Sequence, residues 1–90
     1  MLEREVCVTN RLGLHARAAA QLVRMASGFK CRITLARPDN GVSANAKSIL
    51  SVLHLAAAFG VKVTITADGD DEEGAIEKIT ALFTDKFGEE

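Results

Sequence analysis

The stretch NRLGLHARAAA, residues 10–20, joins a run typical of a β-strand to a run typical of an α-helix. Gly13, His15 and Arg17 lie at this junction. A neutral imidazole is a nucleophile near neutral pH, and the first turn of a helix offers free backbone N–H groups and the positive end of the helix dipole. An arginine guanidinium adds a planar set of donors that matches phosphate oxygens. The stretch therefore brings together a nucleophile, an anion-binding helix end and a fixed cation.

A histidine near a helix start is more often a surface residue or a cap, so this pattern alone leaves a structural role open. However, Gly13-Leu14-His15-Ala16-Arg17 resembles the active-site signature of HPr, the histidine-containing phosphocarrier family of the bacterial phosphoenolpyruvate-dependent phosphotransferase system. A second match follows at Asn45-Ala46-Lys47-Ser48-Ile49-Leu50. Two motifs in the right order are more specific than either alone. With the length and the element order, the resemblance covers essentially the whole chain.

The resemblance implies a phosphoryl-group carrier rather than a free-standing enzyme, and it implies no cofactor. His15 accepts a phosphoryl group on Nδ1 from phosphorylated enzyme I in this interpretation, and passes it to a histidine of a sugar-specific or regulatory EIIA-type acceptor. The backbone N–H groups of Ala16, Arg17 and Ala18 hold the group, with the Arg17 guanidinium beside them. The family usually has proline where this chain has Ala18. Because alanine is an excellent helix former, we expect the helix to persist with a less fixed first turn.

The second motif has two interpretations. Ser48 stands where a helix begins, and serine is a common cap there. In part of the HPr family, the serine of this motif is phosphorylated by an ATP-dependent HPr kinase/phosphorylase, so the resemblance also implies a regulatory site at Ser48. Arg24, Lys47 and Leu50 are expected to contact partner proteins, with Leu50 and Leu55 in an exposed apolar patch.

Composition limits the classes of protein to consider. A length of 90 residues with 48% hydrophobic side chains predicts one small globular domain, residues 1–90. A net charge of −1 gives no reason to expect nucleic acid or a membrane as a partner. Lys and Arg dominate the first half and Asp and Glu the second, which predicts a basic face around His15. No run approaches ~18 apolar residues and the amino end is too charged for a signal peptide, so we expect a cytoplasmic protein. We also expect a monomer, because several partners must reach the same face.

The cysteines and the second histidine give no strong signal. Cys7 and Cys31 make neither a disulfide framework nor a zinc pattern, and both are expected to fill small apolar spaces. His54 has no carboxylate or cysteine at ligand spacing, so no metal site is expected.

Alternating and helical periodicities predict four strands and three helices. Strands are expected at residues 2–9, 29–37, 42–45 and 61–67, and helices at residues 16–27, from 47 or 48 to 57, and 72–87. The apolar positions expected on the helices are Ala16, Ala19, Ala20, Val23 and Ala26 with Leu22 beside them, then Ile49, Val52, Leu53 and Ala56, then Ile76, Ile79, Leu82, Phe83 and Phe87. Alternation along every strand favours antiparallel pairing. The predicted fold is therefore an α+β open-faced β-sandwich, a four-stranded antiparallel sheet with three helices on one face.

Three other functions stay open. A nitrogen-branch carrier, which serves regulatory acceptors instead of sugar permeases, has the same signature. A small regulatory or ligand-binding α+β domain without phosphoryl transfer fits the element order, but gives no reason for Gly13, His15 and Arg17 to stand together. A metal-binding protein is a remote third; its donors are His15, His54, Cys7 and Cys31.

Overall fold

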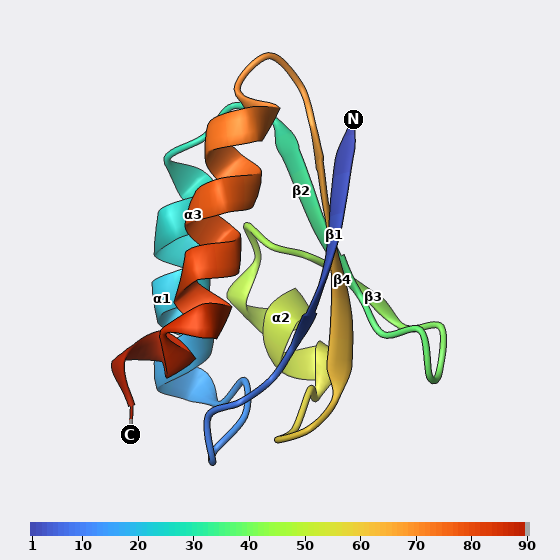
Figure 1. Ribbon diagram of the computed structural model, residues 1–90, viewed down its shortest axis with the longest axis vertical. Coiled ribbons are helices and arrows are strands. Elements are labelled where there is room, and N and C mark those ends of the chain that lie inside the picture. Colours follow the sequence, from blue (N-terminus) through green and yellow to red (C-terminus); the bar gives the residue numbers. More distant parts are fainter. Residues whose placement is uncertain (90) are drawn as a thin grey trace.

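The chain forms the predicted sheet with helices on one side. The computed structural model describes residues 1–89; its elements are β1 (Leu2–Cys7), α1 (Ala16–Ser27), β2 (Arg32–Ala36), β3 (Ser43–Asn45), α2 (Ile49–Leu55), β4 (Lys62–Asp68), α3 (Glu72–Thr84) and the 3-10 turn η1 (Lys86–Gly88). The strand order is β1-β4-β2-β3, and each neighbouring pair is antiparallel. The helices cover one face of the sheet (Figure 1). The predicted α+β open-faced β-sandwich is confirmed.

The core lies between the sheet and the helices. Val63, Ile65 and Ala67 of β4 are fully buried, because alternate side chains of a strand share one face. Ile79 and Phe83 of α3 are buried in the same apolar cluster. One face of the sheet is therefore packed against helices, as the alternation predicts.

Helix α1 has the predicted ends but not the predicted buried face. The residues it buries are Ala18, Ala19, Leu22 and Ala26. Of the other apolar positions expected on this helix, Val23 is half-buried and packs against the core, Ala20 is half-buried, and Ala16 is exposed, so the expectation was wrong for Ala16. Leu22 has the largest apolar side chain among the buried residues of α1. Burial of Leu22 determines which side of α1 faces the core. Ala18 and Ala26 are four residues to either side of Leu22, so they lie on the same side and are buried with it.

Helix α2 is shorter than predicted and buries a different pair of side chains. Val52 and Leu55 are buried, whereas Ile49 and Leu53 are 41% and 36% exposed. Of the apolar stripe expected on this helix, Ile49, Val52, Leu53 and Ala56, only Val52 is buried, so the expected face was wrong. The expectation that Leu55 belongs to an exposed patch was wrong, because in a helix this short Leu55 lies one turn from Val52 and shares its face.

The early end of α2 has a specific cause. Ala56 takes a left-handed conformation, with φ 54°, and ends the helix. The Arg37 guanidinium donates to the carbonyl oxygens of Leu55, at 3.2 Å, and Ala56, at 3.0 Å. Asp39 holds the same guanidinium through two hydrogen bonds. Arg37 thus satisfies carbonyl groups that the end of a helix leaves without partners.

The chain after α3 does not continue as a helix to Phe87. The α-helix ends at Thr84, and Lys86 and Phe87 both have left-handed backbones, with φ 56° and 54°. Phe87 is still buried, and its ring lies edge-on to that of Phe83 with 5.0 Å between the centroids. The two left-handed residues turn the C-terminal end back toward the start of α1 (Figure 1).

The expectations for the two cysteines and for the start of β2 were right only in part. Cys31 is buried as expected, but Cys7 is exposed because it lies on the outer face of β1 at the edge of the sheet. The predicted strand at residues 29–37 begins only at Arg32. Among the described residues, no helix is long and apolar enough to cross a membrane.

Asp71 connects the start of α3 to the start of β2. Its carboxylate accepts hydrogen bonds from the backbone N–H groups of Lys30, at 2.7 Å, and Cys31, at 2.9 Å. The hydrogen bond from Lys30 is the largest of the effects that lower the pKa of the Asp71 carboxyl, and Cys31 adds to it. Glu72 and Glu73 follow in the first turn of α3, where negative charge interacts favourably with the positive end of the helix dipole.

Replacing Asp71 with asparagine is expected to lower the free energy of unfolding near neutral pH. The free energy of unfolding is also expected to fall less between neutral and acidic pH in the variant than in the parent protein. A carboxyl with a lowered folded pKa stabilises the fold above its ordinary value of 3.8, and this contribution is lost as the pH falls through the folded pKa. Urea denaturation of Asp71→Asn and of the parent protein at about pH 7 and about pH 2.5 measures the effect. Asp70→Asn, one residue away and exposed, is the control. The interpretation fails if both variants behave alike.

Candidate functional site

His15 caps the amino end of α1. Its backbone is extended, with φ −77° and ψ 179°, and its ring Nδ1 accepts a hydrogen bond from the Arg17 N–H at 3.3 Å. The first helical bond closes from the Ala19 N–H to the His15 carbonyl at 2.8 Å. The N–H groups of Ala16, Arg17 and Ala18 therefore precede the hydrogen-bond ladder of the helix and lie at its positive end. The capping interpretation of His15 is confirmed, and the cap points Nδ1 at these donors.

The loop before His15 is fixed by hydrogen bonds at both of its ends. Gly13 N–H donates to the Asn10 carbonyl at 3.1 Å, and the Asn10 side-chain amide donates to the Gly13 carbonyl at 2.7 Å. Leu14 N–H donates to the Ala57 carbonyl at 2.9 Å, and the Leu14 side chain is buried. The position of His15 is thus set by a loop that is attached to the segment after α2.

Gly13 fills a place that no other residue can take without strain. Its φ is +65°, and a Cβ built there lies 2.7 Å from the Ala57 carbonyl oxygen and 2.9 Å from Ala58 Cα. We expect Gly13→Ala to lose about 2–4 kcal/mol of unfolding free energy, because the left-handed backbone and the forced repacking both oppose it. Urea denaturation is the measurement.

Gly41→Ala is the matched control, since Gly41 has φ +73° and a Cβ added there has no neighbour within 4 Å. Gly41→Ala is expected to lose only the unfolding free energy that the left-handed backbone costs, about 1–2 kcal/mol. Equal losses in the two variants would contradict the close approach of the Gly13 loop to Ala57.

Glu89 and Asn10 complete the surroundings of His15. The Glu89 carboxylate contacts Nε2 of the His15 ring through Oε2, and its Oε1 accepts from the Asn10 amide at 3.3 Å. The hydrogen bond with His15 lowers the pKa of the Glu89 carboxyl, with Asn10 and the charge of Arg17 acting in the same direction. A ring that accepts at Nδ1 and faces a carboxylate at Nε2 is best satisfied as the neutral tautomer with its proton on Nε2. That tautomer leaves the lone pair on Nδ1.

Sequence reasoning did not find Glu89 or Asn10. Glu89 is separated from His15 by 74 positions, and it follows the predicted last helix with no motif around it that points to His15. Asn10 begins the stretch of residues 10–20, but nothing in its spacing distinguishes it from an ordinary loop residue.

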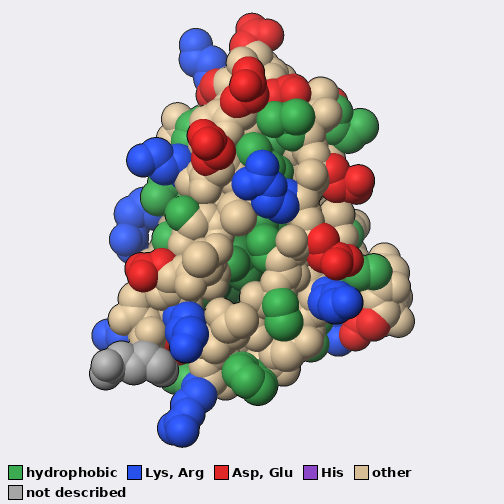
Figure 2. Space-filling model, in the orientation of Figure 1, with side chains coloured by type: hydrophobic (Ala, Val, Ile, Leu, Met, Phe, Trp, Pro, Cys, Tyr) green, Lys and Arg blue, Asp and Glu red, His purple; other side chains and the backbone are tan. Residues whose placement is uncertain are grey.

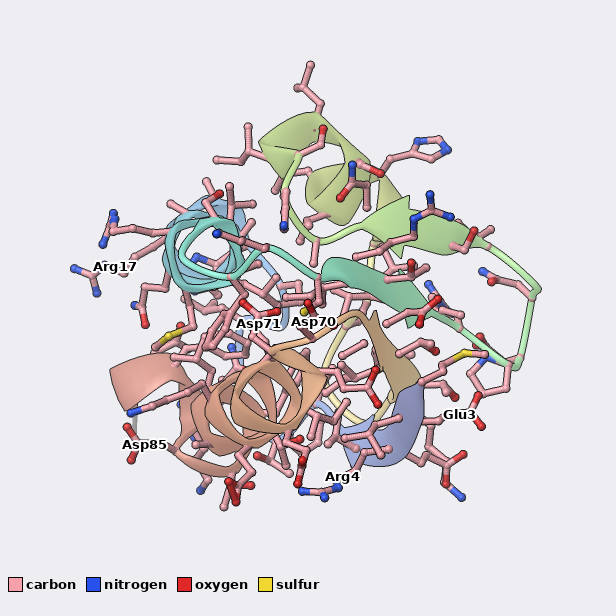
Figure 3. The ribbon with its side chains drawn as sticks, turned by 90° about the horizontal axis from the view of Figure 1, so that it is seen from above. Glu3, Arg4, Arg17, Asp70, Asp71 and Asp85 are labelled. Carbon is pink, nitrogen blue, oxygen red and sulfur yellow. The ribbon has the colours of Figure 1, made fainter. Side chains whose placement is uncertain are left out.

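Arg17 is exposed, and its side chain projects from α1 away from the sheet (Figure 3). Within residues 1–89 the guanidinium makes no hydrogen bond or ion pair with another side chain. The backbone N–H of Arg17, two residues after His15, points at the His15 ring. The Arg17 side chain is therefore exposed to solvent close in sequence to the cap of α1.

The residues of the second motif lie at the start of α2. Ser48 caps α2, and its hydroxyl oxygen accepts from the Ser51 N–H at 3.3 Å, which confirms the capping interpretation. Lys47 Nζ donates to the Phe29 carbonyl at 2.6 Å, so this ammonium is directed to the backbone. Leu50 is 77% exposed, as predicted. Arg24 is exposed in the last turn of α1, the helix that packs beside α2.

Charge is unevenly distributed over the molecule. Figure 2 shows Asp and Glu side chains gathered at the end where α3 begins in Figure 1, while Lys and Arg side chains lie along the side of α1 and toward the opposite end. His15 is at the start of α1, away from the acidic end (Figure 1). The acidic cluster and the start of α1 therefore lie toward opposite ends of the molecule.

The donors of a metal site do not come together. Among residues 1–89 no three His, Cys, Asp or Glu side chains are grouped so that they could hold a metal ion. The structure therefore does not assemble the set His15, His54, Cys7 and Cys31.

Comparison with known proteins finds one family throughout. A family model described as "PTS HPr component phosphorylation site" matches residues 2–85. The chain is 44% identical to Phosphocarrier protein HPr of Cupriavidus necator over 89 residues, covering 99% of this chain and 98% of that protein. It is 41% identical to Phosphocarrier protein NPr of Shewanella violacea over 88 residues, covering 98% of this chain and 94% of that protein.

Solved structures give the same picture. The crystal structure of HPr-C-His from Thermoanaerobacter tengcongensis superimposes with a TM-score of 0.93 at 41% identity, covering 100% of this chain and 99% of that chain. An HPr dimer from the same organism matches with a TM-score of 0.78 at 40% identity, over 99% of this chain and 100% of that chain. A dimer thus exists among the relatives, and the expected monomer is not confirmed for this chain.

Proposed function

The chain belongs to the HPr family of phosphotransferase-system phosphocarriers, and we propose that His15 is the residue that carries the phosphoryl group. The observation that supports His15 is its place as the cap of α1, with Nδ1 directed at the first-turn N–H groups. A neutral ring with its lone pair on Nδ1 is a nucleophile, and the helix end beside it suits a phosphate dianion.

The proposed transfer exchanges one nitrogen–phosphorus bond for another. The Nδ1 lone pair attacks the phosphorus of a phosphohistidine on enzyme I, the donor bond breaks, and its electron pair returns to the donor ring. The proton on Nε2 stays in place. The N–H groups of Ala16, Arg17 and Ala18 and the Arg17 guanidinium bind the phosphoryl oxygens. The same steps in reverse pass the group to a histidine of an EIIA-type acceptor.

Docking of both partners is proposed on the exposed side of α1 and α2. Arg24 offers a cation and Leu50 an exposed apolar side chain on neighbouring helices. Lys47 adds positive charge at this face, although its ammonium is held by the Phe29 carbonyl. Because enzyme I and the acceptors use one face in turn, we propose that residues 1–90 act as a single monomeric domain in the cytoplasm, where these partners meet it.

Ser48 is proposed as a regulatory site for HPr kinase/phosphorylase. It caps the start of α2, so a phosphate attached there meets the positive end of a helix. The same phosphate adds negative charge beside Leu50 on the proposed docking face. The nitrogen-branch carrier is a second candidate, supported by the similarity to the Shewanella NPr.

Incubation with enzyme I and phosphoenolpyruvate, followed by intact mass and site mapping, tests the proposed function. We expect one added phosphoryl group that is labile in acid and stable in base, as a phosphoramidate is, and no addition when enzyme I is omitted. Absence of the modification with an enzyme I from the same cell would contradict the carrier role of His15. It would favour a ligand-binding domain on the same fold.

A further inference from the structure

The C-terminal tail is built so that it reaches the His15 ring. Glu89 N–H donates to the Lys86 carbonyl at 2.9 Å, and the Gln21 side chain of α1 donates to the Phe87 carbonyl at 3.1 Å. Burial of Phe87 anchors the tail in the core. Left-handed residues other than glycine persist only where the surrounding structure holds them, and Lys86 and Phe87 are two in succession. The segment from Lys86 to Glu89 is therefore held in place by the core and by α1, and it brings Glu89 to His15.

The carboxylate of Glu89 is itself oriented from two sides. Its Oε2 contacts His15 Nε2, and its Oε1 accepts from Asn10, whose side chain is 1% exposed. The Asn10 amide is fixed because it donates to the Gly13 carbonyl as well. Its Oδ1 is buried with no hydrogen-bond partner among the described residues, a cost that proteins usually avoid. The Glu89 side chain is 14% exposed and the His15 side chain 26%, so water screens the contact only in part.

We propose that Glu89 is a positioning residue for phosphoryl transfer, which holds the proton of the His15 ring on Nε2 and stabilises the positive charge that the ring acquires. The proposal rests on His15 as the carrier. When Nδ1 forms its bond to phosphorus and Nε2 keeps its proton, the ring becomes a cation. A carboxylate at Nε2 is then in a charge-assisted hydrogen bond. The Glu89 carboxylate is at Nε2, on the other side of the ring from Nδ1, so it is kept away from the negative charge of the phosphoryl group.

Two readouts separate this role from a merely structural one. The first is the ring tautomer of unphosphorylated His15, read from its ¹⁵N shifts; it needs no enzyme I. The second is kcat/KM for phosphoryl acceptance from phosphorylated enzyme I. Glu89→Ala removes the acceptor and the charge, whereas Glu89→Gln keeps an acceptor oxygen and removes only the charge. Glu77→Ala, an exposed carboxylate on α3, is the control.

We expect Glu89→Ala to give a mixture of both tautomers and to lower kcat/KM about tenfold, as loss of a hydrogen bond to a charged group does at a partly exposed site. Glu89→Gln is expected to keep the Nε2–H tautomer and to recover part of the rate. Unchanged tautomer and rate in Glu89→Ala would overturn the proposal. If the parent protein accepts no phosphoryl group, the proposed function fails, but the tautomer measurement still decides whether Glu89 positions the ring.

Discussion

His15→Ala is expected to abolish phosphorylation by enzyme I. The variant loses the imidazole whose Nδ1 lone pair is directed at the first-turn N–H groups of α1, while those N–H groups and Arg17 remain. The fold is expected to persist, because the half-buried His15 lies outside the apolar core and loss of a helix cap costs about 0.5–2 kcal/mol. Intact mass after incubation with enzyme I and phosphoenolpyruvate is the measurement, with urea denaturation as a check on folding.

His54→Ala is the matched control for that experiment. His54 is exposed near the end of α2, and it has no hydrogen bond or ion pair within residues 1–89. We expect it to be phosphorylated to the same extent as the parent protein. Phosphoryl transfer that survives in His15→Ala, or that is lost in His54→Ala, would contradict the assignment of the acceptor.

Arg17→Gln is expected to lower kcat/KM for phosphoryl acceptance about 100-fold, at the lower end of the loss seen when a donor to a developing anion is removed. The guanidinium is exposed and projects from α1 (Figure 3), and Arg17 is two residues after His15, whose Nδ1 accepts from the Arg17 N–H. We therefore expect the side chain to contact a phosphate carried on Nδ1. Arg17→Lys keeps the charge but not the planar pair of donors, and it is expected to recover part of the rate.

The control for Arg17 is a charge that is equally exposed but remote. Arg32 begins β2, where it is paired with Asp68 in the ladder to β4 and lies on the sheet rather than on α1. Arg32→Gln makes the same change in net charge. Equal losses in Arg17→Gln and Arg32→Gln would mean that overall charge, and not phosphate binding by Arg17, sets the rate.

The sequence was sufficient for the fold because its patterns are local. Alternation along β4 and the apolar spacing of α1 each follow from residues that are close in the chain, and the ends of α1 are marked by His15 and Gly28. Family membership was predicted from two short motifs and is confirmed. The face of α2 was predicted wrongly, because seven residues do not determine a stripe and its end depends on Arg37 of a distant turn.

The site was predictable only where its members are neighbours in sequence. His15 and Arg17 are two positions apart, so their meeting at one helix end follows from the start of α1. Glu89 reaches His15 through left-handed residues at Lys86 and Phe87, which replace the last turn of the predicted helix. No periodicity signals such a turn in residues other than glycine, so the contact could be found only in three dimensions.

Which ring nitrogen of His15 carries the phosphoryl group is the most direct test of the proposed carrier site. The structure directs Nδ1 to the Arg17 N–H and Nε2 to the Glu89 carboxylate. In ¹⁵N NMR of the phosphorylated protein, we therefore expect phosphorus coupling at Nδ1 and a retained proton on Nε2. Phosphorus coupling at Nε2 would contradict both the role of the helix end and the role of the carboxylate.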